Sequence, residues 1–148
     1  MIEPADLQAP DVRALLELHL REAQQDACTA AFGIARLAEA DTDVFALRGE
    51  GGALMGIAAM TTLSPEAVEV KSVRTHPDFL RKGVSTQLMD HIEATARKRG
   101  HRFVRLETHP TPAYRAAVAL YQRRGYRERG PFGGHTCSEG SLFMELPL

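Results

Sequence analysis

Several features that would assign this chain to a particular class of protein are missing. Its 18 Lys and Arg residues nearly balance 19 Asp and Glu residues, giving a formal net charge of −1, which argues against broad electrostatic binding to nucleic acid or to an anionic membrane. No apolar run approaches the roughly 20 residues that cross a bilayer. The first residues also lack the basic start and apolar core of a signal peptide. We therefore expect a cytoplasmic protein with neither a nucleic-acid nor a membrane partner.

The chain is also poor in the residues that build disulfide or metal frameworks. Its 2 cysteines, Cys28 and Cys137, lie far apart without CxxC spacing, which predicts two ordinary thiols in a reducing compartment. The 6 histidines include no HxxxH or HExxH pair. We expect no metal site.

What the chain does contain is enough apolar sequence, 44% of its residues, to bury the core of a single domain spanning residues 1–148. Periodicity predicts a helix capped by Asp11 and running to Leu20, and further helices over 30–38, 84–100 and 114–124. Strands are predicted over 44–47, 53–63, 67–75, 103–108 and 141–146. Gly56 marks a bulge or a close backbone approach. This order predicts an α/β (α+β) fold, with a mixed, mostly antiparallel sheet flanked by helices and one parallel βαβ crossover.

The most informative segment is the basic turn from Leu80 to Thr86, which lies between a predicted strand and a predicted helix. A glycine-containing turn that opens a helix directs backbone N–H groups and the positive end of the helix dipole at one anion. Arg81 and Lys82 add full charges. A Walker motif and a GxGxxG fingerprint are both absent around Gly83, so a nucleotide-phosphate binder is a minor alternative. We expect this turn to hold a phosphate group.

The turn resembles that of the GCN5-related N-acetyltransferase (GNAT) superfamily, which grips the pyrophosphate of acetyl-CoA. The family pattern begins with Gln or Arg and ends with Gly or Ala, where this chain has Leu80 and Ser85. His76-Pro77 lies where family members often carry the same dipeptide. A bacterial small-domain subgroup of the family is matched further by Leu106-Glu107-Thr108, Leu120-Tyr121, Pro131-Phe132-Gly133 and Ser141-Leu142-Phe143-Met144. The resemblance implies an acyl-CoA N-acyltransferase fold and an acetyl-CoA-dependent N-acetyltransferase.

The resemblance also implies roles for individual residues. Tyr121 would protonate the leaving thiolate, since a phenol has a pKa of about 10 and a cysteine-type thiol about 8.5. The alternative is a tyrosine that only packs its helix onto the sheet. A backbone N–H between Val73 and Thr75, where two strands splay apart, would stabilise the thioester oxygen. The implied cofactor-binding residues are Val73, Thr75, Arg81, Lys82, Gly83, Val84, Ser85 and Thr86.

The general base is implied at Glu69, with Glu107 or water as rivals. Strand alternation predicts that Glu69 shares a sheet face with Lys71, Val73 and Thr75. The expected acceptor is a primary amine of a small molecule or an exposed peptide, attacking directly. A catalytically silent CoA-binding regulatory module is the alternative function, and the family suggests a homodimer formed through the C-terminal strands.

Overall fold

The computed structural model describes residues 1–23, 34–132 and 141–148, which build one 7-stranded sheet in the order β1-β2-β3-β4-β5-β7-β6. All neighbouring strands are antiparallel except β4 and β5, which are parallel. The predicted mixed, mostly antiparallel sheet is therefore confirmed. The strand bounds are Ile2–Pro4 (β1), Thr42–Arg48 (β2), Leu54–Thr62 (β3), Ala67–Thr75 (β4), Phe103–Thr108 (β5), Arg127–Arg129 (β6) and Leu142–Pro147 (β7).

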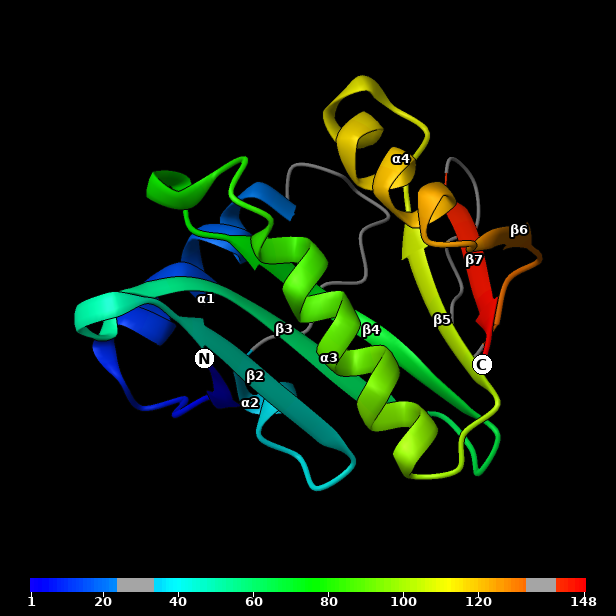
Figure 1. The fold of residues 1–148 in the computed structure, drawn as a ribbon, viewed down its shortest axis with the longest axis horizontal. Helices are drawn as coiled ribbons and strands as arrows, with labels where there is room; N and C mark the ends of the chain where they lie inside the picture. The colour runs from blue at the N-terminus through cyan, green and yellow to red at the C-terminus, as the bar shows by residue number, and fades with distance from the viewer. Residues whose placement is uncertain (24–33, 133–140) are drawn as a thin grey trace.

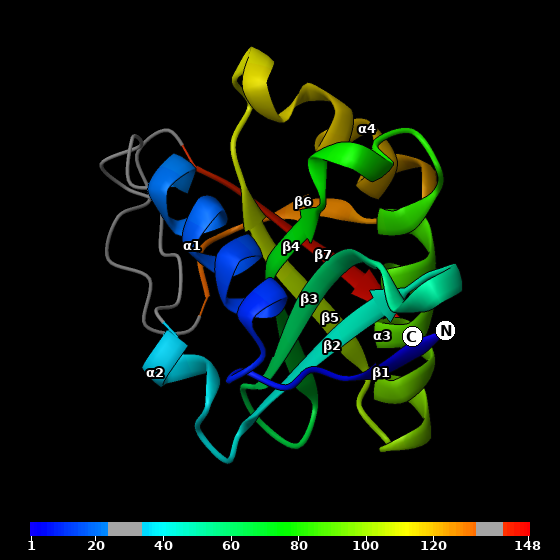
Figure 2. The ribbon, with the colours of Figure 1, turned by 90° about the vertical axis from the view of Figure 1, so that its left-hand side faces the viewer.

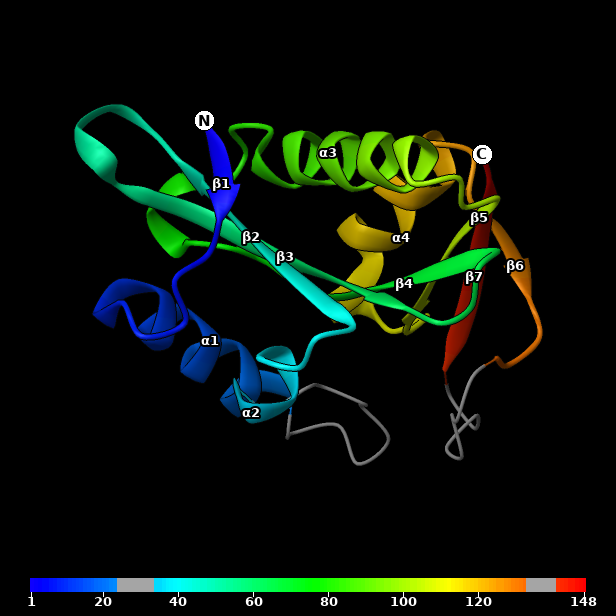
Figure 3. The same cartoon turned by 90° about the horizontal axis from the view of Figure 1, so that it is seen from below.

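Helices cover both faces of this sheet. They span Pro10–Ala23 (α1), Ile34–Leu37 (α2), Val84–Lys98 (α3) and Arg115–Arg123 (α4). Helices α3 and α4 lie on one face, and α1 and α2 lie on the other (Figure 3), so that the sheet separates α1 from α3 in the side view of Figure 2. Helix α3 is the crossover between the parallel strands β4 and β5, as predicted.

Each face of the sheet carries its own apolar layer. The stripe of α3 that periodicity predicts, including Leu88 and Ile92, is buried against β4 residues such as Val68. On the opposite face, α1 buries Val12 and Leu16 among a second apolar cluster. Full burial of a side chain of this size contributes roughly 1.5–3 kcal/mol, so these two layers fix both helices on the sheet.

Some element ends differ from the predictions. Helix α1 begins at Pro10, so Asp11 lies in its first turn, where the carboxylate accepts the Val12 N–H at 2.8 Å and binds Arg48 at 2.7 Å. A 3₁₀ turn at Pro112–Tyr114 precedes α4. The three-residue strands β1 and β6 were not predicted. Part of the predicted helix 30–38, both cysteines and Gly133 lie outside the described residues.

Strands β4 and β5 pair only at their first residues. The parallel register runs from Ala67 opposite Phe103 to Glu69 opposite Arg105. Beyond this point the two strands diverge (Figure 1), while β5 stays paired with β7 as far as Thr108. The divergence opens the sheet beside the N-terminal end of α3, which is the splayed arrangement that the family resemblance implied.

A bulge in β4 changes which face its side chains occupy. Ser72 has φ +56°, and the β3–β4 register shifts between Ile57 and Ala59. An extra residue in a strand shifts its alternation by one. As a result Val73 packs with the α3-side cluster that contains Val68, whereas Glu69 points to the α1 side. The prediction that Glu69 shares a face with Val73 and Thr75 is therefore wrong.

Candidate active site

The turn before α3 is shaped to hold an anion. Arg81 and Gly83 both have left-handed backbone conformations, with φ of +63° and +75°, and such residues turn neighbouring N–H groups toward one side. A Cβ added at Gly83 meets no atom of the described chain within 4 Å, so the glycine serves backbone conformation and not space. Gly83 is the N-cap of α3 and, in the described structure, no side chain caps it. The first N–H groups of α3 are thus left for a ligand.

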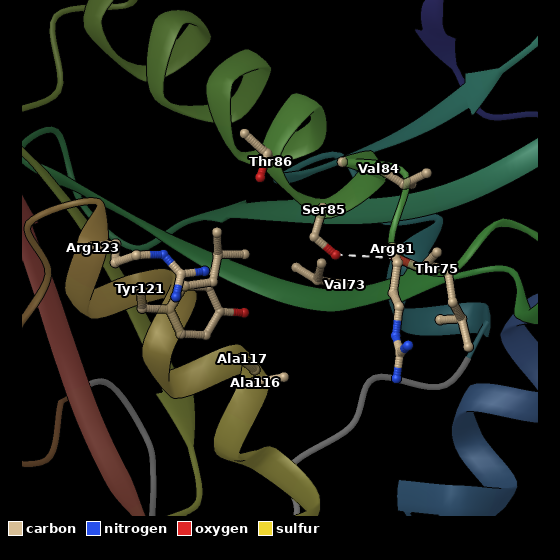
Figure 4. Close-up of a pocket in the computed structure, with 13 residues that line it drawn as sticks. Val73, Thr75, Arg81, Val84, Ser85, Thr86, Ala116, Ala117, Tyr121 and Arg123 are labelled. Carbon is tan, nitrogen blue, oxygen red and sulfur yellow. Dashed lines mark hydrogen bonds between the residues drawn. The ribbon is translucent and has the colours of Figure 1, made fainter.

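Helix α3 approaches the sheet very closely at its first turn. A Cβ added at Gly56 lies 2.5 Å from Val84 Cγ1 and 2.9 Å from the backbone oxygen of Arg74, which confirms the predicted close approach. Gly56 pairs with Thr75, and the Thr75 and Ser85 hydroxyls are hydrogen-bonded at 3.1 Å (Figure 4). The turn is thereby tied to the end of β4.

A cavity of about 540 Å³ lies between this turn, the end of β4 and helix α4. Arg81 and Arg123 line it, and no carboxylate of the described residues does, so its wall is basic. Among the predicted cofactor-binding residues, all but Lys82 lie in the wall. The complete lining is Val73, Thr75, Leu80, Arg81, Gly83, Val84, Ser85, Thr86, Ala116, Ala117, Leu120, Tyr121 and Arg123.

Tyr121 projects from α4 into this cavity (Figure 4), with its ring opposite Val73 and Ser85. Its side chain is only 8% exposed. Burial raises the pKa of the Tyr121 phenol to about 12, because a low-dielectric environment disfavours the phenolate. The phenol is therefore protonated at neutral pH and has its proton available for a stronger base that develops beside it.

Glu69 lies on the other side of the sheet. It is 4% exposed, its carboxylate pairs with Lys71 Nζ at 3.1 Å, and it is the last β4 residue that pairs with β5. It does not line the cavity. Glu107, its rival, lies further along β5, opposite Phe143 of β7. The predicted acid Tyr121 and the predicted base Glu69 thus lie on opposite faces of the sheet.

The sequence reasoning missed part of the cavity wall. Arg123 and Ala116 both lie in the predicted helix 114–124, but nothing in the sequence marks either as a residue of the site. Leu80 was noted only as a departure from the family turn, yet it is 59% exposed and lies in the wall. The place of these residues in the wall is seen only in the structure, because it depends on how α4 packs beside the turn.

An anion-binding turn beside a basic cavity that reaches the unpaired end of β4 suits a pantetheine chain with a pyrophosphate at one end. The geometry therefore defines an acyl-CoA-dependent transferase. Residues 9–126 match the Acetyltransferase (GNAT) family, and the chain belongs to this family.

Relatives support the same conclusion along the whole chain. The N-acetyltransferase YedL of Escherichia coli strain K12 is 31% identical over 150 residues, covering 99% of this chain and 94% of that protein. A crystal structure described as an acyl-CoA N-acyltransferase, from Klebsiella pneumoniae subsp. pneumoniae MGH 78578, has a TM-score of 0.80 at 27% identity, covering 100% of this chain and 97% of that chain. A GNAT family acetyltransferase from Elizabethkingia anophelis with acetyl-CoA bound shares the fold, with a TM-score of 0.71 at 14% identity and coverage of 100% and 97%.

The chain is therefore an acetyl-CoA-dependent N-acetyltransferase, with acetyl-CoA as its co-substrate. The residues present fit this co-substrate, since the N–H-rich turn beside Arg81 suits the pyrophosphate and the cavity leads on to Tyr121. In the described ranges, no helix is long and apolar enough to cross a membrane. The same ranges hold no group of 3 or more His, Cys, Asp or Glu side chains that could bind a metal ion.

Proposed function

We propose that the enzyme transfers the acetyl group by direct attack of a primary amine, either of a small molecule or of an exposed peptide. The observation that carries this proposal is the cavity, which brings the phosphate turn, the open edge of β4 and Tyr121 together. Acetyl-CoA supplies an activated thioester when bound. The protein supplies the phosphate grip, a donor for the thioester oxygen, an acid and a base.

The open edge of β4 is the proposed donor for the thioester oxygen. Beyond Glu69, β4 has no ladder partner on the β5 side within the described strands. Beyond the bulge at Ser72, Val73 and Thr75 both line the cavity. One N–H group placed where negative charge develops contributes roughly 2.7–4 kcal/mol to the transition state.

Tyr121 is the proposed acid for the leaving thiolate. Its phenol is buried in the cavity wall and stays protonated at neutral pH because burial raises its pKa to about 12. Tyr121→Phe removes the proton and preserves the ring, so turnover should fall by about 10²-fold. Isothermal titration should give an acetyl-CoA affinity close to that of the parent enzyme. An unchanged turnover would remove Tyr121 from this role.

Glu69 is the proposed base for the acceptor amine. Its support is its position, on the face opposite the cavity and at the last paired residue before the strands diverge. Glu69→Gln should slow turnover most at a pH where the acceptor is an ammonium ion. Activity should recover as the pH rises through the pKa of the acceptor, because a neutral amine needs no base before attack.

The matched variant is Glu107→Gln, on the neighbouring strand. If Glu107→Gln shows the pH-dependent loss of turnover and Glu69→Gln does not, the base is Glu107. If neither variant shows the loss, water takes the proton. Melting temperatures of both variants are needed in parallel, since Glu69 is paired with the buried Lys71 and loss of the charge leaves that ammonium less compensated.

The acceptor class is tested with a panel of amines and thiol-release detection. Small amines and peptides with free N-termini or lysines should be compared at equal concentration. Binding of acetyl-CoA without release of thiol for any amine in the panel would favour the silent CoA-binding module instead.

The homodimer is proposed to form through the C-terminal strands. In the described sheet, β6 is an edge strand that pairs only with β7, and an edge strand offers free backbone groups to a second copy. Light scattering should then give twice the 16.3 kDa mass of one chain. A monomer mass would contradict this assembly.

A further inference from the structure

Helix α3 is joined to the end of α4 by a buried polar cluster that has no part in the proposed acid, base or phosphate contacts. Glu93 of α3 is 6% exposed. Its carboxylate accepts hydrogen bonds from Arg124 Nε at 3.0 Å, from Arg124 Nη2 at 2.8 Å and from the Tyr126 hydroxyl at 3.0 Å. Arg124 also binds Asp90, one turn earlier on α3, at 2.6 Å. Charge-assisted, bidentate bonds of this kind hold their partners in one geometry.

The same residues form the C-terminal end of the helix that carries Tyr121. Gly125 has φ +99°, its N–H donates to Gln122 at 3.1 Å, and the Tyr126 N–H donates to the Tyr121 carbonyl at 3.0 Å. These two bonds are those of a Schellman motif, in which the residue after the glycine packs against the residue that opens the last turn. That contact here is between the rings of Tyr126 and Tyr121, with centroids 5.6 Å apart.

Packing, and not hydrogen bonding, therefore sets where the Tyr121 phenol lies. Within the described residues, its hydroxyl makes no hydrogen bond, and its position follows from the helix end and from the Tyr126 ring. Helix α4 has only 9 residues, so the cluster at its end is a large part of what fixes it. Helix α3 begins at the phosphate turn and carries Glu93 further along, so one rigid helix bears both the turn and the anchor of α4.

We propose that Glu93, through Arg124 and Tyr126, is a positioning residue that holds Tyr121 at a fixed distance from the phosphate turn. This inference rests on the proposed role of Tyr121 as the acid. Glu93 itself does not line the cavity, so it acts only through the placement of the phenol. A reacting group displaced by about 1 Å loses up to about 10²-fold in rate.

A double-mutant cycle between Glu93 and Tyr121 tests the proposal. Glu93→Gln in the parent enzyme should lower kcat by about tenfold and leave the KM for acetyl-CoA within about twofold, since the phosphate turn is not touched. In a Tyr121→Phe background, Glu93→Gln should change kcat by less than about twofold, because the group that it positions is already gone. Arg124→Lys, which keeps one charged contact, should give an intermediate kcat.

Two further variants complete the design. Tyr126→Phe removes only the hydroxyl that binds Glu93 and keeps the ring against Tyr121, so it provides a milder second cycle if Glu93→Gln does not fold. Asp43→Asn is the matched control, because it breaks a 2.6 Å bond to Arg99, at the far end of α3. It should leave kcat unchanged.

The possible results separate the inference from the function on which it rests. Equal losses from Glu93→Gln with and without the Tyr121 hydroxyl overturn the inference and leave the acid role standing. A parent-like kcat for both Glu93→Gln and Tyr126→Phe also overturns it. If Tyr121→Phe alone keeps full turnover, the acid role itself fails.

Discussion

Replacing Gly56 with alanine tests how closely α3 must approach the sheet for the active site to form. The added Cβ would lie 2.5 Å from Val84 Cγ1 and 2.9 Å from the Arg74 backbone oxygen, against an optimum near 3.5–4.0 Å, or roughly 1 Å more. The Arg74 oxygen belongs to a paired strand and cannot rotate away. Relief of the Val84 contact needs the first turn of α3 to move outward by about 1 Å, and the Arg74 contact is relieved by a smaller shift of β4 relative to β3.

The stability change can be worked out from two opposing terms. Overpacking of a buried site costs roughly 1–3 kcal/mol. Removing a glycine from the unfolded chain returns roughly 0.4–1 kcal/mol. The net loss is about 0–2.6 kcal/mol with a midpoint of about 1.3 kcal/mol, and the midpoint lowers the melting temperature of a chain of this size by roughly 3–5 °C.

The more specific effect is on acetyl-CoA. Val84 and Ser85 move with the helix, so the bond between Ser85 and Thr75 is stretched and the phosphate turn shifts relative to the rest of the cavity. We expect the dissociation constant of acetyl-CoA, measured by isothermal titration, to rise about tenfold. Gly130→Ala is the control, because a Cβ there meets no atom of the described chain within 4 Å. Parent-like stability and affinity in Gly56→Ala would refute the reasoning.

Two further predictions concern charge. Arg81→Gln removes a charge from the phosphate turn and keeps a non-glycine residue at the left-handed position, so it should weaken acetyl-CoA binding severalfold without unfolding the protein. The dissociation constant of acetyl-CoA should then depend less on salt concentration than it does in the parent. An equal salt dependence in the two proteins would contradict the phosphate contact. Burial, aided by the nearby Arg74 charge, lowers the pKa of His19 below its usual 6.5, so the unfolded chain binds this proton more readily and stability falls as the pH drops below 6.5. In urea titrations of His19→Asn, the free energy of unfolding should fall less steeply with decreasing pH below 6.5 than in the parent. An equally steep fall would contradict a role for His19.

Much of the fold could be predicted from the sequence because its elements follow simple periodicities. The predicted strands 67–75 and 103–108 coincide with β4 and β5, and the apolar stripe of α3 is buried as expected. Strands β1 and β6 could not be predicted, because a three-residue strand is too short to show alternation. Each forms by pairing with a longer neighbouring strand. Their formation depends on tertiary pairing and not on local propensity.

The residues of the cavity wall could be predicted where they belong to the basic turn and were missed where their place depends on packing. The basic turn with Gly83 before a predicted helix can be recognised from the sequence alone, and so can the Leu-Tyr pair on a later helix. The close approach at Gly56 was foreseen because glycine in a strand has few other uses. The cluster of Glu93, Arg124 and Tyr126 was not foreseen, because its members are far apart in the chain and each alone is an ordinary polar residue.

The bulge at Ser72 explains both the principal error and the division of the site. A serine with φ +56° carries no sequence signature, so regular alternation placed Glu69 beside Val73. The structure instead turns Val73 and Thr75 to the α3 side while Glu69 remains on the α1 side. A regular strand would put the phosphate grip and the proposed base on one face, where acetyl-CoA and the acceptor would compete for the same space. One additional residue in β4 therefore puts the phosphate grip and the proposed base on opposite faces, on either side of the gap between β4 and β5.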